Sequence, residues 1–251
     1  MTTPRTNKPP SLASVPIDPR HNQLLASLSD LDWHKWRTHL EPVDLVLGQV
    51  LCDPGRGSFY GVFPTTAIVS WLCLTRDGAS AEVAIVGNDG VVGISSVLEG
   101  QAMPCRAVVQ SAGHGYRISA QWVNNEVRRS GAVLQMLLRY TQAVVAQIAQ
   151  TAVCNRFHSI DQQLARRLLL GLDRLPADEL DMTQELAANL LGVRREGVTA
   201  AAHKLQRAGV IRYNRGHIVV LDRHRLEQST CECYAVAKKE YRRLLPLPMA
   251  A

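Results

Sequence analysis

The chain has 251 residues, of which 46% are apolar, so it can bury the core of one large or two ordinary domains and is not a disordered protein. Lys and Arg number 28 and Asp and Glu 22, which gives a net charge of +6. Segment 194–225 holds 8 of the basic residues and only 2 of the acidic ones. Such a local excess indicates a polyanionic partner at that segment, with a solvated basic face as the alternative.

No segment of the chain predicts export or a membrane span. Residues 1–20 are polar and rich in proline, lack the apolar core of a signal peptide, and are expected to form a flexible leader. The most apolar stretch, 132–153, contains an arginine and several glutamines that are costly to bury in hydrocarbon. The six cysteines form no CxxC pair, which is typical of a reducing compartment. We therefore expect a cytoplasmic protein without a membrane partner.

Two cysteines, Cys231 and Cys233, stand close together in the sequence. A Cys-x-Cys pair can ligate a metal ion or sense oxidation, but no second pair stands nearby in the sequence. No metal site and no cofactor are therefore predicted. The chain also lacks the G-x-S-x-G, H-E-x-x-H and P-loop spacings, so it is not expected to be an enzyme and no catalytic residue is assigned.

After the leader, the sequence changes from a helical to a β-rich pattern. Residues 22–40 carry leucines at helical spacing and are interrupted at Ser29, a favourable N-cap, so they predict two short helices. Residues 42–118 hold short apolar runs separated by turn signals such as 53–55 and 87–90. This block predicts an antiparallel barrel, sandwich or roll.

Residues 121–158 return to a helical pattern, with a break at Gly131. Two apolar lines follow the break, and a helix with two apolar faces needs two partners. One line has the 4-3-4-3-4 spacing of a coiled-coil seam and predicts a dimer interface. Its members are Leu134, Leu138, Thr141, Val145, Ile148 and Ala152. An ordinary buried helix in a monomer is the alternative.

The segment 182–221 has the pattern of a winged helix-turn-helix. Thr183 is a favourable N-cap for a first helix, which Gly192 ends, and a second helix runs over 195–208. Two β-rich runs around an Asn-Arg-Gly turn then predict a hairpin, the wing.

The second of these helices is predicted to read DNA, because recognition helices present their N-terminal residues to the base edges. Arginine can bond guanine and glutamate can accept from cytosine. We predict base contacts from Arg194, Arg195, Glu196 and Thr199. Phosphate contacts are predicted for Thr183, Gln184, Lys204, Arg207, Arg212 and Arg215.

At this point the chain resembles the Crp/Fnr family of transcription regulators. The resemblance is carried by Gly192 with Arg195-Glu196-x-Val198, by Asp161-x-x-Leu164-Ala165-Arg166-x-Leu168, and by Gly87-x-x-Gly90-x-x-Gly93 in the β block. It implies an α+β fold with an N-terminal antiparallel β-roll sensor domain at 21–120, a dimerisation helix at 121–158 and a winged helix-turn-helix domain at 159–251. It also assigns the base-reading pair to Arg195 and Glu196.

The resemblance places an effector pocket at Gly93, Ile94, Ser95 and Arg106. Members that bind cyclic nucleotides carry Gly-Glu-Leu where this chain has Gly93-Ile94-Ser95, and Ile94 cannot accept hydrogen bonds from ribose hydroxyls. The effector is therefore expected to be an unidentified small molecule other than cAMP. Oxygen-sensing members carry an N-terminal cysteine group, and residues 1–51 contain no cysteine.

The sequence thus predicts a homodimeric regulator that binds double-stranded DNA at a near-palindromic site, with RNA polymerase as a further possible partner. The alternative is a ligand-binding signalling module whose winged helix contacts protein instead of DNA.

Overall fold

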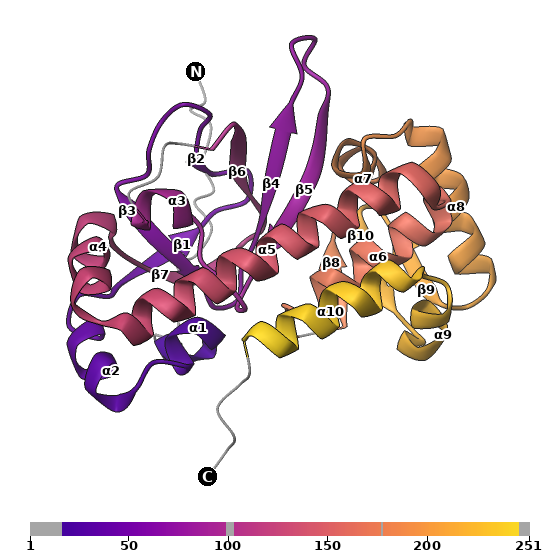
Figure 1. The fold of residues 1–251 in the computed structure, drawn as a ribbon. Coiled ribbons are helices and arrows are strands. Elements are labelled where there is room, and N and C mark those ends of the chain that lie inside the picture. Colours follow the sequence, from indigo (N-terminus) through magenta and orange to yellow (C-terminus); the bar gives the residue numbers. More distant parts are fainter. Residues whose placement is uncertain (1–16, 99–102, 177, 246–251) are drawn as a thin grey trace, which may run out of the picture.

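The computed structural model describes residues 17–98, 103–176 and 178–245 (Figure 1). The β strands of the N-terminal half gather at one end of the long helix α5 (Gly131–Phe157), and the C-terminal helices gather at the other. Most of the predicted leader lies outside the described residues. Among the described residues, no helix has both the length and the apolarity needed to cross a bilayer.

The predicted N-terminal helices form as α1 (Gln23–Ala26) and α2 (Asp30–Trp36), after a 3-10 turn, η1 (Pro19–His21). Ser29 caps α2 as expected, since its hydroxyl accepts a hydrogen bond from the Asp32 backbone N–H at 3.1 Å. Trp36 is fully buried and meets the rings of Phe63 and Trp122 edge-on. This aromatic cluster fastens α2 to the β domain.

The β block folds into two antiparallel sheets, in the strand orders β1-β7-β3 and β2-β6-β4-β5. The strands are β1 (Glu41–Leu45), β2 (Val50–Cys52), β3 (Tyr60–Pro64), β4 (Ile68–Leu74), β5 (Ser80–Val86), β6 (Cys105–Ser111) and β7 (Gly113–Ser119). A short helix, α3 (Ile94–Val97), separates β5 from β6. Cys73 and Cys105 form a disulfide because they are register partners on β4 and β6. The sequence argument assigned no such pair.

The helical segment that follows is divided into α4 (Ala120–Arg129) and α5, one residue before the predicted break. Ser130 lies between them, and its hydroxyl caps α5. Val133, Leu137, Tyr140 and Val144 are buried against the β domain. The Tyr140 hydroxyl donates to the Val91 carbonyl at 3.0 Å. One of the two predicted apolar lines of α5 is therefore covered within the chain.

A second apolar core is built mainly by α6, α7 and α8 of the C-terminal part, and Ile68 and Ile85 of the β domain also belong to it. The elements of the C-terminal part are α6 (Ile160–Leu172), β8 (Glu179–Asp181), α7 (Gln184–Leu191), α8 (Arg195–Arg207), β9 (Ile211–Asn214), β10 (His217–Val220), α9 (Arg223–Gln228) and α10 (Glu232–Leu244). The sheet order is β8-β10-β9. The sequence argument anticipated neither β8 nor the last two helices.

Two buried ion pairs join α6 and the segment just after it to the β domain. Arg167 lies 2.6 Å from Glu82, and Arg174 lies 2.6 Å from Asp89. Burial alone would lower the pKa of Arg174, but Asp89 holds this pKa above its ordinary value. The last helix, α10, runs back along α5 (Figure 1). The two halves of the chain therefore meet over both polar and helical contacts.

Candidate nucleic-acid interface

The first helix of the helix-turn-helix is fixed at both ends by the residues that the sequence singled out. The Thr183 hydroxyl accepts from the Leu186 backbone N–H at 3.1 Å, and Gly192 ends α7 with a φ of 65°. That left-handed conformation favours glycine. The chain then turns directly into α8, whose N-cap is Arg194.

Helix α8 has one face in the core and one in solvent. Val198, Ala201, Ala202 and Leu205 are buried, whereas Arg194, Arg195 and Glu196 are exposed. Among the described residues, no carboxylate pairs with Arg194 or Arg195. The start of α8 therefore presents two unneutralised guanidinium groups and one carboxylate to solvent.

The wing lies beside this helix because three hydrogen bonds hold it there. The Tyr213 backbone N–H donates to Gln206 of α8 at 2.9 Å, and the Tyr213 hydroxyl donates to the Met182 carbonyl at 2.8 Å. The Met182 backbone N–H in turn donates to the Gly216 carbonyl at 2.6 Å. Burial raises the pKa of Tyr213, while the nearby Arg195 charge opposes that shift.

The tip of the wing is a two-residue turn with positive φ at both central positions, 49° at Arg215 and 88° at Gly216. These angles are those of a type I′ hairpin turn, in which asparagine and glycine are favoured. Arg215 is the one non-glycine residue with positive φ among the described residues. Arg212 and Arg215 are both exposed on the hairpin.

The elements enclose an open hollow of about 330 Å³ between α7, α8 and the wing. It is lined by Thr183, Gln184, Arg195, Ala202, His203, Gln206, Tyr213, Arg215 and Gly216. Four of the predicted contact residues thus converge, although they come from separate segments. The sequence argument missed His203, Gln206 and Tyr213. Helical spacing could have identified Gln206, because it follows Arg195 by eleven residues and therefore lies on the same face of α8.

Several predicted contact residues have side-chain partners within the chain. The Thr199 hydroxyl lies 2.7 Å from the Gln184 side-chain oxygen. Lys204 forms an ion pair with Asp161 at the start of α6. Nine residues separate Lys204 from Arg195, which places them about 180° apart around the helix axis. Arg207, by contrast, is exposed and lies on the side of α8 that carries Glu196.

The helix-turn-helix region matches a known family of domains. Residues 162–229 match the family model of the Crp-like helix-turn-helix domain. These residues therefore form a Crp-like helix-turn-helix domain. The match supports DNA-binding transcription regulation. The resemblance inferred from the sequence is thereby confirmed, and so is the α+β fold class.

Solved structures share this fold over most of the chain. FixK2 from Bradyrhizobium japonicum is 17% identical, with a TM-score of 0.64, over 76% of this chain and 98% of its own. A Crp/Fnr-family transcriptional regulator from Thermus thermophilus is 19% identical, with a TM-score of 0.60, over 79% and 98%. The c-di-GMP-responsive global regulator CLP from Xanthomonas campestris is 15% identical, with a TM-score of 0.58, over 74% and 96%. No curated protein matches the chain.

The effector pocket that the sequence predicts is nearly filled. Gly93, Ile94 and Ser95 line a hollow of about 20 Å³ among the described residues, and the Ile94 side chain is buried. Arg106 does not line this hollow, because its guanidinium binds Asp53 at 2.7 Å. That volume holds about one water molecule, whereas ligand pockets usually measure about 300 Å³ or more.

The predicted dimer seam lies on the side of α5 that the β domain leaves open. Leu138 is 52% exposed and Val145 is 59% exposed. Ala152 is also exposed, while Leu134, Thr141 and Ile148 are partly covered. The seam therefore differs sharply from the buried line of α5.

Metal-ligating side chains gather at a different place, where α5 ends and α10 begins. Cys231 and Cys233 lie beside Cys154 and His158 there, although the sequence shows no second pair near them. The fold brings these ligating residues together although Cys154 and Cys231 are 77 residues apart.

Proposed function

We propose that this chain is a homodimeric, sequence-specific DNA-binding transcription regulator of the Crp/Fnr type. The observation that carries the proposal is the hollow between α7, α8 and the wing, where Thr183, Gln184, Arg195 and Arg215 converge. Hydrogen-bond donors and unpaired cations on one open face suit the phosphates and base edges of a duplex.

In this proposal the start of α8 enters the major groove. Arg195 and Glu196 read base edges, Arg194 stands at the helix N-terminus beside them, and Thr199 lies one turn further along. The bond between Thr199 and Gln184 gives these two residues a joint role, since it orients the Gln184 amide toward the hollow.

The phosphate contacts then come from around the rim of the hollow. Thr183 and Gln184 lie at the start of α7, Arg212 and Arg215 on the wing, and Arg207 near the end of α8. Lys204 contributes least, because Asp161 neutralises it on the opposite side of α8.

A homodimer follows from the exposed apolar line on α5. Leu138 and Val145 occupy positions seven residues apart, the repeat of a coiled-coil seam, and both are more than half exposed in the single chain. A second copy of α5 covers this line and sets two recognition helices about one helical turn of DNA apart, roughly 34 Å. A near-palindromic operator follows from the two-fold axis.

The effector in this proposal is a small molecule other than cAMP. The buried Ile94 and the nearly filled hollow around it argue against cAMP at this place. CLP, which shares the fold, is described as responsive to c-di-GMP, so effectors of this fold are not restricted to cAMP. RNA polymerase is the expected partner where the protein activates transcription. The domain division at 21–120, 121–158 and 159–251 is retained as part of the proposal.

The proposal is tested by selecting bound duplexes from a random pool with the purified chain at low salt. We expect enrichment of a near-palindromic sequence and a dimeric mass in sedimentation. Leu138→Glu should yield monomers that bind single half-sites weakly. Glu185→Gln, an exposed change on α7 outside the proposed contact set, is the matched control and should leave both results unchanged. A chain that stays monomeric and retains no duplex at low salt contradicts the proposal.

A further inference from the structure

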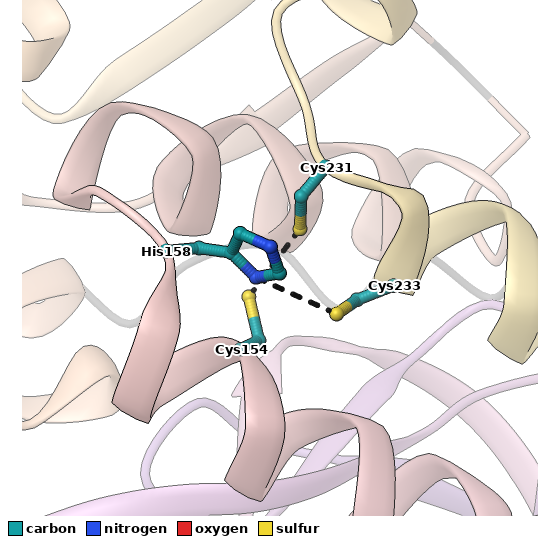
Figure 2. A group of neighbouring side chains, drawn as sticks. All are labelled: Cys154, His158, Cys231 and Cys233. Atoms are coloured by element: carbon teal, nitrogen blue, oxygen red, sulfur yellow. Dashed lines mark hydrogen bonds between the residues drawn. The ribbon is translucent and has the colours of Figure 1, made fainter.

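Four side chains with metal-ligating atoms meet where α5 ends and α10 begins (Figure 2). Cys154 and His158 are four residues apart, so they lie on one face at the end of α5. Cys231 and Cys233 come from the first turn of α10, where Cys231 is the N-cap. The ligand atoms of all four residues lie within 4.8 Å of one another.

The spacing of these atoms fits the ligands of one tetrahedral ion. The Cys154 and Cys231 sulfur atoms are 3.6 Å apart, and the Cys233 sulfur is 3.6 Å from His158 Nδ1. Zinc–sulfur and zinc–nitrogen bonds of about 2.3 and 2.05 Å give tetrahedral edges of about 3.8 Å between sulfurs and about 3.6 Å between sulfur and nitrogen. Small displacements of the side chains would therefore bring all four atoms to bonding distance of a central ion.

The surroundings of His158 also suit a metal ligand. Its Nδ1 faces the sulfur atoms, while its Nε2 lies 3.2 Å from a carboxylate oxygen of Glu232. A histidine ligand usually donates its second ring N–H to such a carboxylate, which fixes the ring and its tautomer. Gln163 holds the backbone at the same place, because its side-chain N–H groups donate to the His158 carbonyl at 2.9 Å and to the Cys154 carbonyl at 3.4 Å.

A buried positive charge next to the cluster supplies an independent indication. Arg166 is only 6% exposed, and no carboxylate pairs with it among the described residues. One of its terminal nitrogens donates to the Thr151 hydroxyl at 2.9 Å, but its Nε finds no hydrogen-bond partner in the described part of the chain. Its charge acts on both Cys154 and Cys233. Three thiolates, a neutral imidazole and a divalent ion carry a net charge of −1, which balances the arginine.

Other uses of the cluster fit the structure less well. The irons of a cubane cluster bind separate thiolates, which therefore stand further apart than the ligands of one ion. Reactive thiols usually lie in partly exposed positions. Here Cys154, Cys231 and Cys233 are all buried. Cys154 and Cys231 do not form a disulfide, because their sulfur atoms are 3.6 Å apart.

We propose that Cys154, His158, Cys231 and Cys233 bind one Zn²⁺ ion with tetrahedral geometry. The ion ties the end of the predicted dimerisation helix to α10, the last helix of the C-terminal domain. It thereby fixes the direction in which the chain leaves α5 for the DNA-binding domain. Bound Zn²⁺ also stabilises the folded chain, because the four ligands come together only on folding.

The first experiment measures metal content on the purified full-length chain after chelator treatment and addition of Zn²⁺ alone. We expect about one tightly held zinc per chain, because the four ligands complete one tetrahedral site. Cys154→Ser and Cys233→Ser should lose it. Cys52→Ser is the matched control, since Cys52 is the remaining free cysteine and lies in the β domain. Zinc retained by both cluster variants, or lost from Cys52→Ser, overturns the assignment.

The second experiment replaces zinc by Co²⁺, whose optical spectrum reports ligand type and geometry. We expect tetrahedral visible bands and a thiolate charge-transfer band in the wild-type chain. His158→Cys keeps one ion per chain and strengthens the charge-transfer band, which a serine variant that merely failed to fold could not show. Octahedral Co²⁺ bands, a Cys154–Cys231 disulfide in mass spectra of the chain purified under anaerobic conditions, or labile sulfide with iron bound at these cysteines each overturns the zinc assignment.

A third measurement follows thermal unfolding with and without added Zn²⁺. The midpoint should rise in the wild-type chain and in Cys52→Ser, and stay unchanged in Cys154→Ser. An equal rise of the midpoint in the wild-type chain and both variants would place the zinc effect outside the cluster and contradict the proposal. None of these measurements uses DNA, so they are independent of the proposed function.

Discussion

Two arginines in and just after α6 are paired within the fold, whereas those of α8 and the wing face solvent. Arg167 and Arg174 are each 4% exposed and are bonded to carboxylates of the β domain. Arg195 and Arg215 are exposed, and no described carboxylate pairs with them. The first group joins two parts of one chain, whereas the second is left free for a partner.

The difference shows that net charge does not measure the surface available to DNA. Residues 155–251 hold 16 basic and 11 acidic residues, yet several of those cations are neutralised within the fold. Breaking a buried pair leaves an uncompensated charge, while removing an exposed cation costs the folded chain little. Substitutions at the two groups should therefore separate stability from DNA affinity.

The largest effect is expected for Arg174→Met. The substitution leaves the Asp89 carboxylate buried without its cation, which should lower the free energy of unfolding by about 3–5 kcal/mol. Urea denaturation followed by circular dichroism measures this loss. Arg207→Met, an exposed site on α8, is the control and should change it by less than about 0.5 kcal/mol. Similar losses in the two variants would remove the distinction between the groups.

Arg195→Ala should act on DNA recognition instead of stability. We expect a loss of about 1–3 kcal/mol in binding free energy and relaxed preference at one base pair. Competition binding against operators with single base changes measures both quantities. Arg212→Ala on the wing should weaken all sequences evenly, so an unchanged preference profile for Arg195→Ala would contradict its base-reading role.

Arg215→Asn should change stability and DNA affinity in opposite directions. Asparagine suits the left-handed backbone at the wing tip better than arginine, so the free energy of unfolding should rise by about 1 kcal/mol. Loss of a phosphate contact should weaken all duplexes and reduce the salt-dependence slope by about 1. Arg212→Asn, at ordinary backbone angles, should weaken binding without any gain in stability. A stability loss at Arg215→Asn would be inconsistent with strain at this turn.

The smallest effect is expected for Lys204→Ala. Its charge is paired with Asp161 on the side of α8 away from Arg195, so DNA affinity should change by less than about 0.5 kcal/mol. Arg207→Ala, on the open side, should lower affinity more and reduce the salt dependence. Fluorescence anisotropy over a range of salt concentrations compares them, and a larger loss for Lys204→Ala would reverse the assignment of faces.

The sequence predicts the local features of the DNA-binding region well, because each depends on neighbouring residues. Thr183 as a cap, Gly192 as a helix end and the Arg215-Gly216 turn are all set by backbone requirements within a few positions. The same holds for the cap at Ser29. The functional roles of these residues remain predictions, since they depend on contacts with bound DNA.

Features that depend on long-range topology were not predicted. The short strand β8 is defined by its pairing with β10, and a sequence of three residues does not indicate which strand will pair with it. Cys73 and Cys105 become partners only through the register of β4 and β6. The group of Cys154, His158 and the Cys-x-Cys pair needs α10 to return along α5. Helical spacing alone did not reveal that Lys204 faces Asp161.

The return of α10 along α5 has a consequence for how the molecule comes apart. Tyr234, near the start of α10, belongs to the C-terminal core, while Leu245, just after its end, packs against the core of the β domain. A single helix therefore crosses the boundary between two hydrophobic cores. Unfolding of one core removes packing contacts from the other. Calorimetry should therefore show one cooperative transition for the whole chain, without a separate transition for the C-terminal part.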